Sequence, residues 1–179
     1  MELKTERLYL RPLTTEDKES FFEYRSNSET NKYQGWIPKK IEDVEVFIGK
    51  ISNKINVPET WFQFVIIEQH SDTLIGDIGV HFMDSENRQA EVGCTLNKHF
   101  QGKGYATESL RAVIEYLIHT LNKHRVITSI NPENLNSIRL VKQLGFRKEA
   151  HFVESLFING KWVDDLQFSL LAQEWKKRN

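Results

Sequence analysis

Two glycines and a lysine, Gly102, Lys103 and Gly104, stand between an apolar run and a helical pattern. The first turn of a helix leaves backbone N–H groups without partners, and the helix dipole gives that end a partial positive charge. Because glycine has no side chain, a phosphate can approach those N–H groups closely. The segment is therefore predicted to cradle a pyrophosphate, and Lys103 can add positive charge.

Two common phosphate-binding motifs do not fit this segment. A P-loop requires Gly, four residues and then Gly-Lys-Ser/Thr, but Asn97 stands in the place of the first glycine and Gly104 follows the lysine. A dinucleotide fingerprint, G-x-G-x-x-G, fits the first two glycines, whereas Thr107 takes the third position. The structural alternative is a tight turn between a strand and a helix that binds nothing.

Short apolar or alternating runs predict the strands that position this segment. They lie at residues 8–11, 61–68, 74–83, 90–96 and 124–130, and on both sides of the hairpin signal Asn159-Gly160. Helices are predicted in four segments: one that starts at a capping box formed by Thr14 and Asp17, and others within residues 41–55, 104–121 and 131–145.

The passage from Glu91 to Ile130 reads strand, helix, strand, so its two strands are expected to lie parallel in one sheet. Short polar turns connect the other strands and favour antiparallel pairing. The expected fold class is α+β (mixed α/β), a single domain over residues 1–179. Its central sheet is mixed and mostly antiparallel, with about six to seven strands and helices on both faces.

Composition excludes several classes of protein. The 179 residues carry 24 basic and 25 acidic side chains, a net charge of −1, which disfavours a nucleic-acid binder. No apolar run reaches the length of about 18 residues that a membrane span needs, and the N-terminus lacks a secretory signal. A single cysteine, Cys94, cannot form a disulfide within the chain, so a reducing cytosol is expected.

Gln101-x-x-Gly104-x-Ala106 resembles the acetyl-coenzyme A loop, Q/R-x-x-G-x-G/A, of the GNAT superfamily of N-acetyltransferases. Three other segments are similar to the ribosomal-protein-alanine/serine acetyltransferase branch, in the same order and at suitable spacing. They are "TERLYLRPLTTED", "NPENLNSIRLVKQLGF" and "FINGKWVDDLQFSLLAQEW". The resemblance implies the GNAT fold, with two splayed strands and acetyl-CoA as co-substrate in the gap between them.

The resemblance also implies a role for each cofactor-binding segment. Backbone groups of one strand would pair with the pantetheine arm; they belong to Val92, Gly93, Cys94, Thr95 and Leu96. Loop amides would hold the pyrophosphate; they belong to Gln101, Gly102, Lys103, Gly104, Tyr105, Ala106 and Thr107. Asn134 and Ser137 would lie near the thiol end, although such residues also serve as ordinary helix caps.

The implied reaction is direct attack of a neutral amine on the acetyl thioester. Glu91 is the expected general base, because the corresponding acid has this role in several family members; the alternative is a surface carboxylate at a strand end. Ser137 is the candidate that assists the thiolate leaving group. Many members use a tyrosine after the second cofactor helix, but no tyrosine follows Gly145 here. This departure leaves the general acid open.

Cysteine and histidine give no sign of other chemistry. Cys94 is expected to be a small buried residue and not a nucleophile. The six histidines show no metal-ligand spacing, so no metal is expected.

The acceptor pocket is expected between the loop of residues 29–41 and the terminal hairpin, which is also a candidate for forming a homodimer. Its candidate residues are Tyr33, Trp36, His81 and Trp162, for which core packing is the alternative.

The predicted function is acetylation of a protein N-terminal α-amine or of a small amine. Members of such branches also acetylate polyamines and aminoglycosides, and a non-catalytic module that binds or senses acyl-CoA is the alternative of another class.

Overall fold

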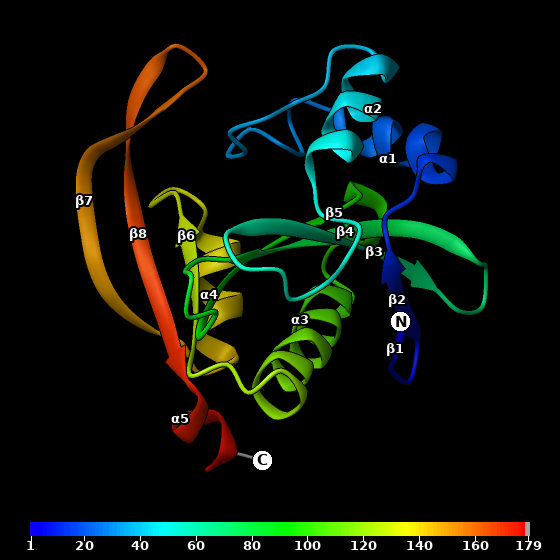
Figure 1. The fold of residues 1–179 in the computed structure, drawn as a ribbon. Helices are drawn as coiled ribbons and strands as arrows, with labels where there is room; N and C mark the ends of the chain where they lie inside the picture. Colours follow the sequence, from blue (N-terminus) through cyan, green and yellow to red (C-terminus); the bar gives the residue numbers. More distant parts are fainter. Residues whose placement is uncertain (178–179) are drawn as a thin grey trace.

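The computed structural model describes residues 1–177, in which one mixed eight-stranded sheet carries helices on both faces (Figure 1). The strand order is β1-β2-β3-β4-β5-β6-β8-β7, and every neighbouring pair is antiparallel except β5 and β6. The strands are β1 (Leu3–Lys4), β2 (Leu8–Pro12), β3 (Thr60–Glu68), β4 (Thr73–Phe82), β5 (Gln89–Leu96), β6 (Arg125–Ile130), β7 (Arg147–Ile158) and β8 (Lys161–Leu171). The sheet has more strands than the six to seven predicted from the sequence; β1 was missed because it has two residues and no periodic pattern.

The helices are α1 (Lys18–Arg25), α2 (Ile41–Lys50), α3 (Tyr105–Glu115), α4 (Leu135–Gln143) and α5 (Ala172–Lys176). The predicted capping box is present: the backbone N–H of Thr14 donates to the Asp17 carboxylate at 2.9 Å.

The predicted second helix was too long. It ends at Lys50, and Ser52 donates its backbone N–H to the Trp61 carbonyl at 2.7 Å. Ile51 and Ile55 nevertheless pack against the core, from a loop instead of a helix. At the other end of the chain, the sequence predicted no helix at α5, since five residues are too few for a periodic signal.

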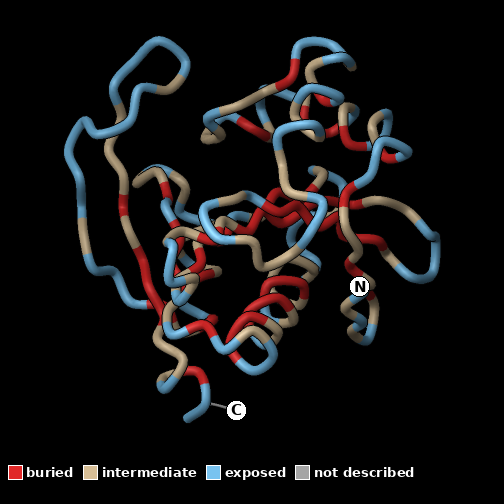
Figure 2. The backbone as a smooth tube through the Cα atoms, viewed as in Figure 1, coloured by how far each residue is buried: buried red, intermediate tan, exposed pale blue. Residues whose placement is uncertain are grey.

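Alternating residues of the central strands bury two separate clusters. Ile66 and Ile78 belong to the larger cluster, which includes apolar residues of α3 and α4. Val65 and Ile67 belong to the smaller cluster with α1 and α2. Figure 2 shows buried residues running through the middle of the sheet and along α3. Helices therefore cover both faces, as predicted, with α1 and α2 on one and α3 and α4 on the other (Figure 1).

The parallel pair β5–β6 is joined only at its start. Gln89–Glu91 pairs with Arg125–Ile127, and the two strands have no paired residues beyond that point. The edge of β5 from Val92 to Leu96 that faces β6 consequently has no strand partner. This splay is the feature of the predicted fold that can admit a ligand backbone into the sheet.

Within the described part of the chain, no helix has the length and apolar character required to cross a lipid bilayer.

Candidate active site

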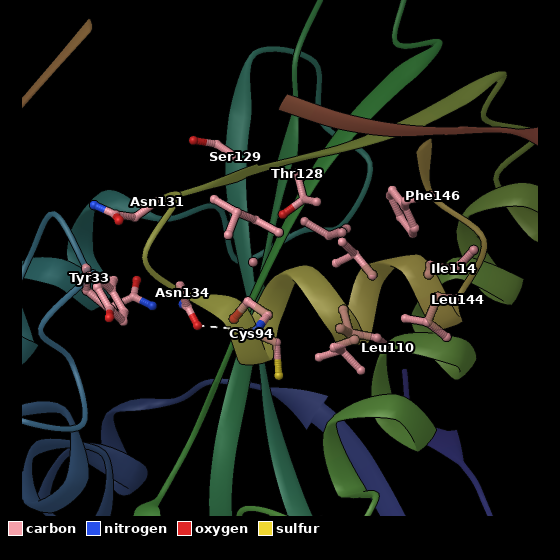
Figure 3. Close-up of a pocket in the computed structure, with 17 residues that line it drawn as sticks. Tyr33, Cys94, Leu110, Ile114, Thr128, Ser129, Asn131, Asn134, Leu144 and Phe146 are labelled. Carbon is pink, nitrogen blue, oxygen red and sulfur yellow. Dashed lines mark hydrogen bonds between the residues drawn. The ribbon is translucent and has the colours of Figure 1, made fainter. Parts of the chain in front are cut away.

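A cavity that is partly open to solvent lies where the pairing of β5 and β6 ends. Tyr33 and Gln34 line it from the α1–α2 connection, whereas Leu110 and Ile114 line it from α3 on the opposite face of the sheet. The remaining lining residues are Val92, Gly93, Cys94, Thr128, Ser129, Ile130, Asn131, Asn134, Ser137, Leu140, Val141, Leu144 and Phe146. Figure 3 shows these side chains converging, with Tyr33 at one end of the view and Phe146 at the other. The cavity is therefore a slot that passes through the sheet.

The N-terminus of α4 forms one wall of the slot. Asn134 is the N-cap, and its side-chain oxygen accepts a hydrogen bond from the backbone N–H of Ser137 at 3.2 Å (dashed in Figure 3). Both residues also line the cavity. The cap uses the backbone N–H of Ser137 and not its hydroxyl, so the hydroxyl can still contact a ligand.

The glycine loop stands at the N-terminus of α3, the helix whose Leu110 and Ile114 line the slot. Gly102 has φ +75° and Gly104, the N-cap of α3, has φ +83°. Residues with a β-carbon rarely adopt such positive φ angles, which explains why glycine occupies these positions. The Gln101 side-chain amide donates to the Leu96 carbonyl at 3.0 Å and ties the loop to the end of β5.

Glu91 is the last residue of β5 that pairs with β6, and so it marks the point where the splay begins. It lies in a row across three strands with His81 and Trp61. The rings of Trp61 and His81 stack with centroids 4.7 Å apart, and His81 Nδ1 is 3.8 Å from Glu91 Oε2. Burial raises the pKa of Glu91 above its usual range; His81 opposes this effect and Asp165 adds to it. A carboxylate with a raised pKa is a stronger base near neutral pH.

Cys94 lines the slot, but its environment makes it unreactive. Burial, with a smaller contribution from Asp77, raises the pKa of the Cys94 thiol to about 12. The thiol therefore stays protonated at neutral pH and is a poor nucleophile.

The comparisons with known proteins agree with this geometry. Residues 7–147 match the family model described as the acetyltransferase (GNAT) domain. The chain belongs to the GNAT acetyltransferase family. It is an acetyl-CoA-dependent N-acetyltransferase.

The N-acetyltransferase YnaD of Bacillus subtilis (strain 168) is 34% identical over 178 residues, 98% of this chain and 99% of that protein. The [ribosomal protein uS5]-alanine N-acetyltransferase of Escherichia coli (strain K12) is 34% identical over 84 residues, 47% of this chain and 43% of that protein.

Two solved GNAT structures have the same fold. A GNAT-family acetyltransferase from Bacillus anthracis superposes with a TM-score of 0.86 at 29% identity, covering 97% of this chain and 100% of the other. The spermidine N-acetyltransferase of Vibrio cholerae in complex with CoA and spermine superposes with a TM-score of 0.83 at 24% identity, covering 96% of this chain and 99% of the other.

The aromatic residues predicted for the acceptor pocket of this GNAT domain have different positions. Tyr33 lines the slot and donates its hydroxyl to the Glu133 carbonyl at 3.2 Å. His81 lies beside Glu91. Trp36 does not line the slot, because it stacks on Phe47 at 4.7 Å in the smaller core cluster.

Trp162 does not line the slot either. It lies near the tip of the β7–β8 hairpin, 59% exposed and 5.3 Å from the ring of Phe157. Figure 1 shows this hairpin extending away from the rest of the GNAT domain. Trp36 packs in the smaller core cluster and Trp162 is exposed, so an acceptor role for either tryptophan stays a prediction.

Two ion pairs beside the site could not be predicted from the sequence. Arg25 Nη2 lies 2.5 Å from Asp77 Oδ2 in the interior, where Tyr24 also donates to Asp77 at 2.5 Å. Arg7 and Glu108 form the second pair, next to the glycine loop. The members of each pair are 52 and 101 residues apart in sequence, so no local signal could have found them.

Among residues 1–177, no group of three or more His, Cys, Asp or Glu side chains is arranged to hold a metal ion.

Proposed function

We propose that this GNAT enzyme acetylates a protein N-terminal α-amine or a small amine by direct attack, with Glu91 as general base. The observation that carries the proposal is the slot through the sheet, with Glu91 at the point where β5 and β6 separate. A donor can enter from the α3–α4 face, and an acceptor can approach from the α1–α2 face. The two substrates would then meet at the level of Val92 and Gly93.

Backbone groups hold the donor in this proposal. Acetyl-CoA, when bound, supplies the acetyl thioester that the amine attacks. The free edge of β5, Val92–Leu96, offers hydrogen bonds to the amides of the pantetheine arm, as a further strand would. Amides of residues 101–107 hold the diphosphate at the start of α3. An N–H of the Val92–Cys94 stretch is placed to stabilise a developing oxyanion.

Glu91 removes the proton that keeps the amine unreactive. A lysine amine has a pKa near 10.4 and a peptide α-amine near 7.7–8.0, a difference of about 2.5 units or about 3.4 kcal/mol in deprotonation. At neutral pH roughly one α-amine in ten is already uncharged. A partly buried carboxylate that acts through water is therefore sufficient for an α-amine, while a lysine-like amine depends on it more strongly.

The departing thiolate needs a proton donor, and no tyrosine follows Gly145 to supply it. Four hydroxyl side chains line the slot: Tyr33 from the α1–α2 connection, Thr128 and Ser129 from β6, and Ser137 from α4. We assign assistance of the leaving group to Ser137, because its position on α4 corresponds to the thiol end of the cofactor in the family.

A polyamine is the second candidate acceptor. The spermidine N(1)-acetyltransferase of Vibrio cholerae is 25% identical over 158 residues. Two carboxylates, Glu91 and Asp165, interact electrostatically beside the slot and would attract a polycation. The relative from Escherichia coli, whose name specifies a ribosomal-protein alanine, favours the α-amine instead.

The test is release of free thiol from acetyl-CoA across a panel of acceptors at neutral pH. The panel contains peptides with free N-terminal Ala or Ser, the same peptides blocked at the N-terminus but carrying lysine, spermidine and an aminoglycoside. The proposal predicts turnover for the free N-terminal peptides above that for the blocked ones. Turnover of spermidine alone would select the second candidate, and tight CoA binding without thiol release for any acceptor would favour a sensor.

A further inference from the structure

Arg7 lies in the turn between β1 and β2 and reaches the first turn of α3. Its Nε and Nη2 atoms lie 2.7 and 2.6 Å from Glu108 Oε2, and its backbone N–H donates to Glu108 Oε1 at 2.9 Å. The Thr5 hydroxyl donates to the same Oε1 at 2.6 Å. Four donor atoms therefore converge on one carboxylate, which is only 18% exposed. Such a fork of paired hydrogen bonds fixes the guanidinium geometrically.

The same guanidinium also contacts the glycine loop. Arg7 Nη1 donates to the Lys103 carbonyl at 3.0 Å, and the guanidinium carbon lies 4.5 Å from the centre of the Tyr105 ring. Nη2 is 3.3 Å from the place where a Cβ on Gly104 would be. Arg7 thus touches three consecutive residues of the loop that we assign to the diphosphate.

This contact determines the direction of a backbone amide. In a trans peptide the C=O and the following N–H point in opposite directions, and the structure has no cis peptide bonds among its described residues. Because the Lys103 carbonyl points to Arg7, the N–H of Gly104 points to the other side of the loop. Gly104 has no β-carbon, which would lie 3.3 Å from Arg7 Nη2, so the guanidinium can approach this peptide closely.

We propose that Arg7 is a positioning residue for the donor diphosphate: it fixes the Lys103–Gly104 peptide so that the Gly104 N–H is presented to the phosphates. The inference rests on the proposed function of the loop and extends it to a residue outside the loop. Arg7 also neutralises Glu108, whose charge at the start of α3 would otherwise repel a diphosphate. In this role Arg7 acts through its contacts with the loop and with Glu108, not by direct contact with the diphosphate.

The experiment compares two ligands that share the pantetheine arm. The dissociation constant of CoA is measured by titration calorimetry and that of pantetheine, which lacks the diphosphate and the nucleotide, by competition. For Arg7→Gln we expect CoA to bind at least about tenfold more weakly and pantetheine to bind within about twofold of the unchanged protein. Arg7→Lys keeps the charge but lacks the fork, so we expect it to restore only part of the CoA affinity.

Arg11→Gln is the matched control. Arg11 lies on β2 and holds Asp17 in a similar two-pronged pair, at 2.8 and 2.6 Å, without any contact to the glycine loop. It should leave CoA binding unchanged.

An Arg7→Gln protein with unchanged CoA affinity, or with equal losses for CoA and pantetheine, would overturn the inference. Full CoA affinity in Arg7→Lys would do so as well, since charge alone would then be sufficient. Failure of the unchanged protein to bind CoA at all would instead overturn the proposed function of the loop.

Discussion

The donor side and the acceptor side that we propose for the slot are built from different parts of the polypeptide. The donor side consists of backbone: the free edge of β5, the loop around Gly102 and Gly104, and the capped start of α4. The acceptor side consists of side chains that meet across strands, with Glu91 and His81 as its polar members. Backbone donors recognise what every acyl-CoA shares, whereas side chains distinguish one amine from another. The donor half is therefore the generic part of this GNAT enzyme and the acceptor half the individual part.

In each half, an ion pair joins two segments that are far apart in sequence. Arg7 and Glu108 hold the glycine loop, and Arg25 and Asp77 hold α1 against β4 on the acceptor face. The second pair is buried, and removing one partner of such a pair costs about 3–5 kcal/mol because an unpaired charge is left in the interior. The first pair is partly exposed, so we expect it to matter more for binding than for stability.

The largest effect should come from the backbone half. Gly104→Glu places a side chain at φ +83°, 3.3 Å from Arg7 Nη2, and adds negative charge where the phosphates should lie. We expect a loss of CoA affinity of at least about 100-fold, measured by titration calorimetry. Gly49→Glu, the same change at an exposed helical glycine whose Cβ would meet nothing within 4 Å, is the control. Unchanged affinity in a folded Gly104→Glu protein would remove the distinction between the two halves.

Glu91→Gln should have a smaller effect, and one that depends on the acceptor. For a lysine-like amine we expect kcat to fall by about 100-fold or more. For an α-amine we expect a fall in kcat that is about ten times smaller, because the α-amine needs less help with deprotonation. CoA affinity should not change. Steady-state kinetics with a matched pair of peptides measures both, with Glu86→Gln in an exposed turn as the control. Equal losses for the two amines would show that Glu91 is not the base.

The smallest effect concerns stability. Since burial raises the pKa of Glu91 in the folded protein, the folded state binds this proton more tightly than the unfolded state. The group stabilises the fold below its unfolded pKa, near 4.3, and this contribution is lost as pH rises through the raised folded pKa.

Thermal unfolding across this pH range measures that contribution. At pH 7 we expect the melting temperature of Glu91→Gln to equal that of the unchanged protein or to lie at most a few degrees above it. At pH 4 we expect no increase in melting temperature. A lower melting temperature at pH 7 would mean that the Glu91 carboxylate is a structural group.

The same contrast explains what could be predicted from the sequence. The glycine loop, the Asn134 cap and the parallel pair around α3 depend on local signals, and the structure contains all three. The positions of the acceptor residues depend on how distant segments pack together. The residue type of Trp36 or Trp162 does not predict whether the side chain lies in a core cluster or on the surface. Arg7 and Glu108 are 101 residues apart, so only the folded chain brings them together.

A crystal structure of the protein with CoA would show directly whether the donor occupies the slot between β5 and β6. We expect diphosphate oxygens within hydrogen-bonding distance of backbone amides of residues 102–106, and the pantetheine arm along the free edge of β5 at Val92–Leu96. Density for CoA in any other place, or in this slot with its diphosphate turned away from the glycine loop, would contradict this expectation.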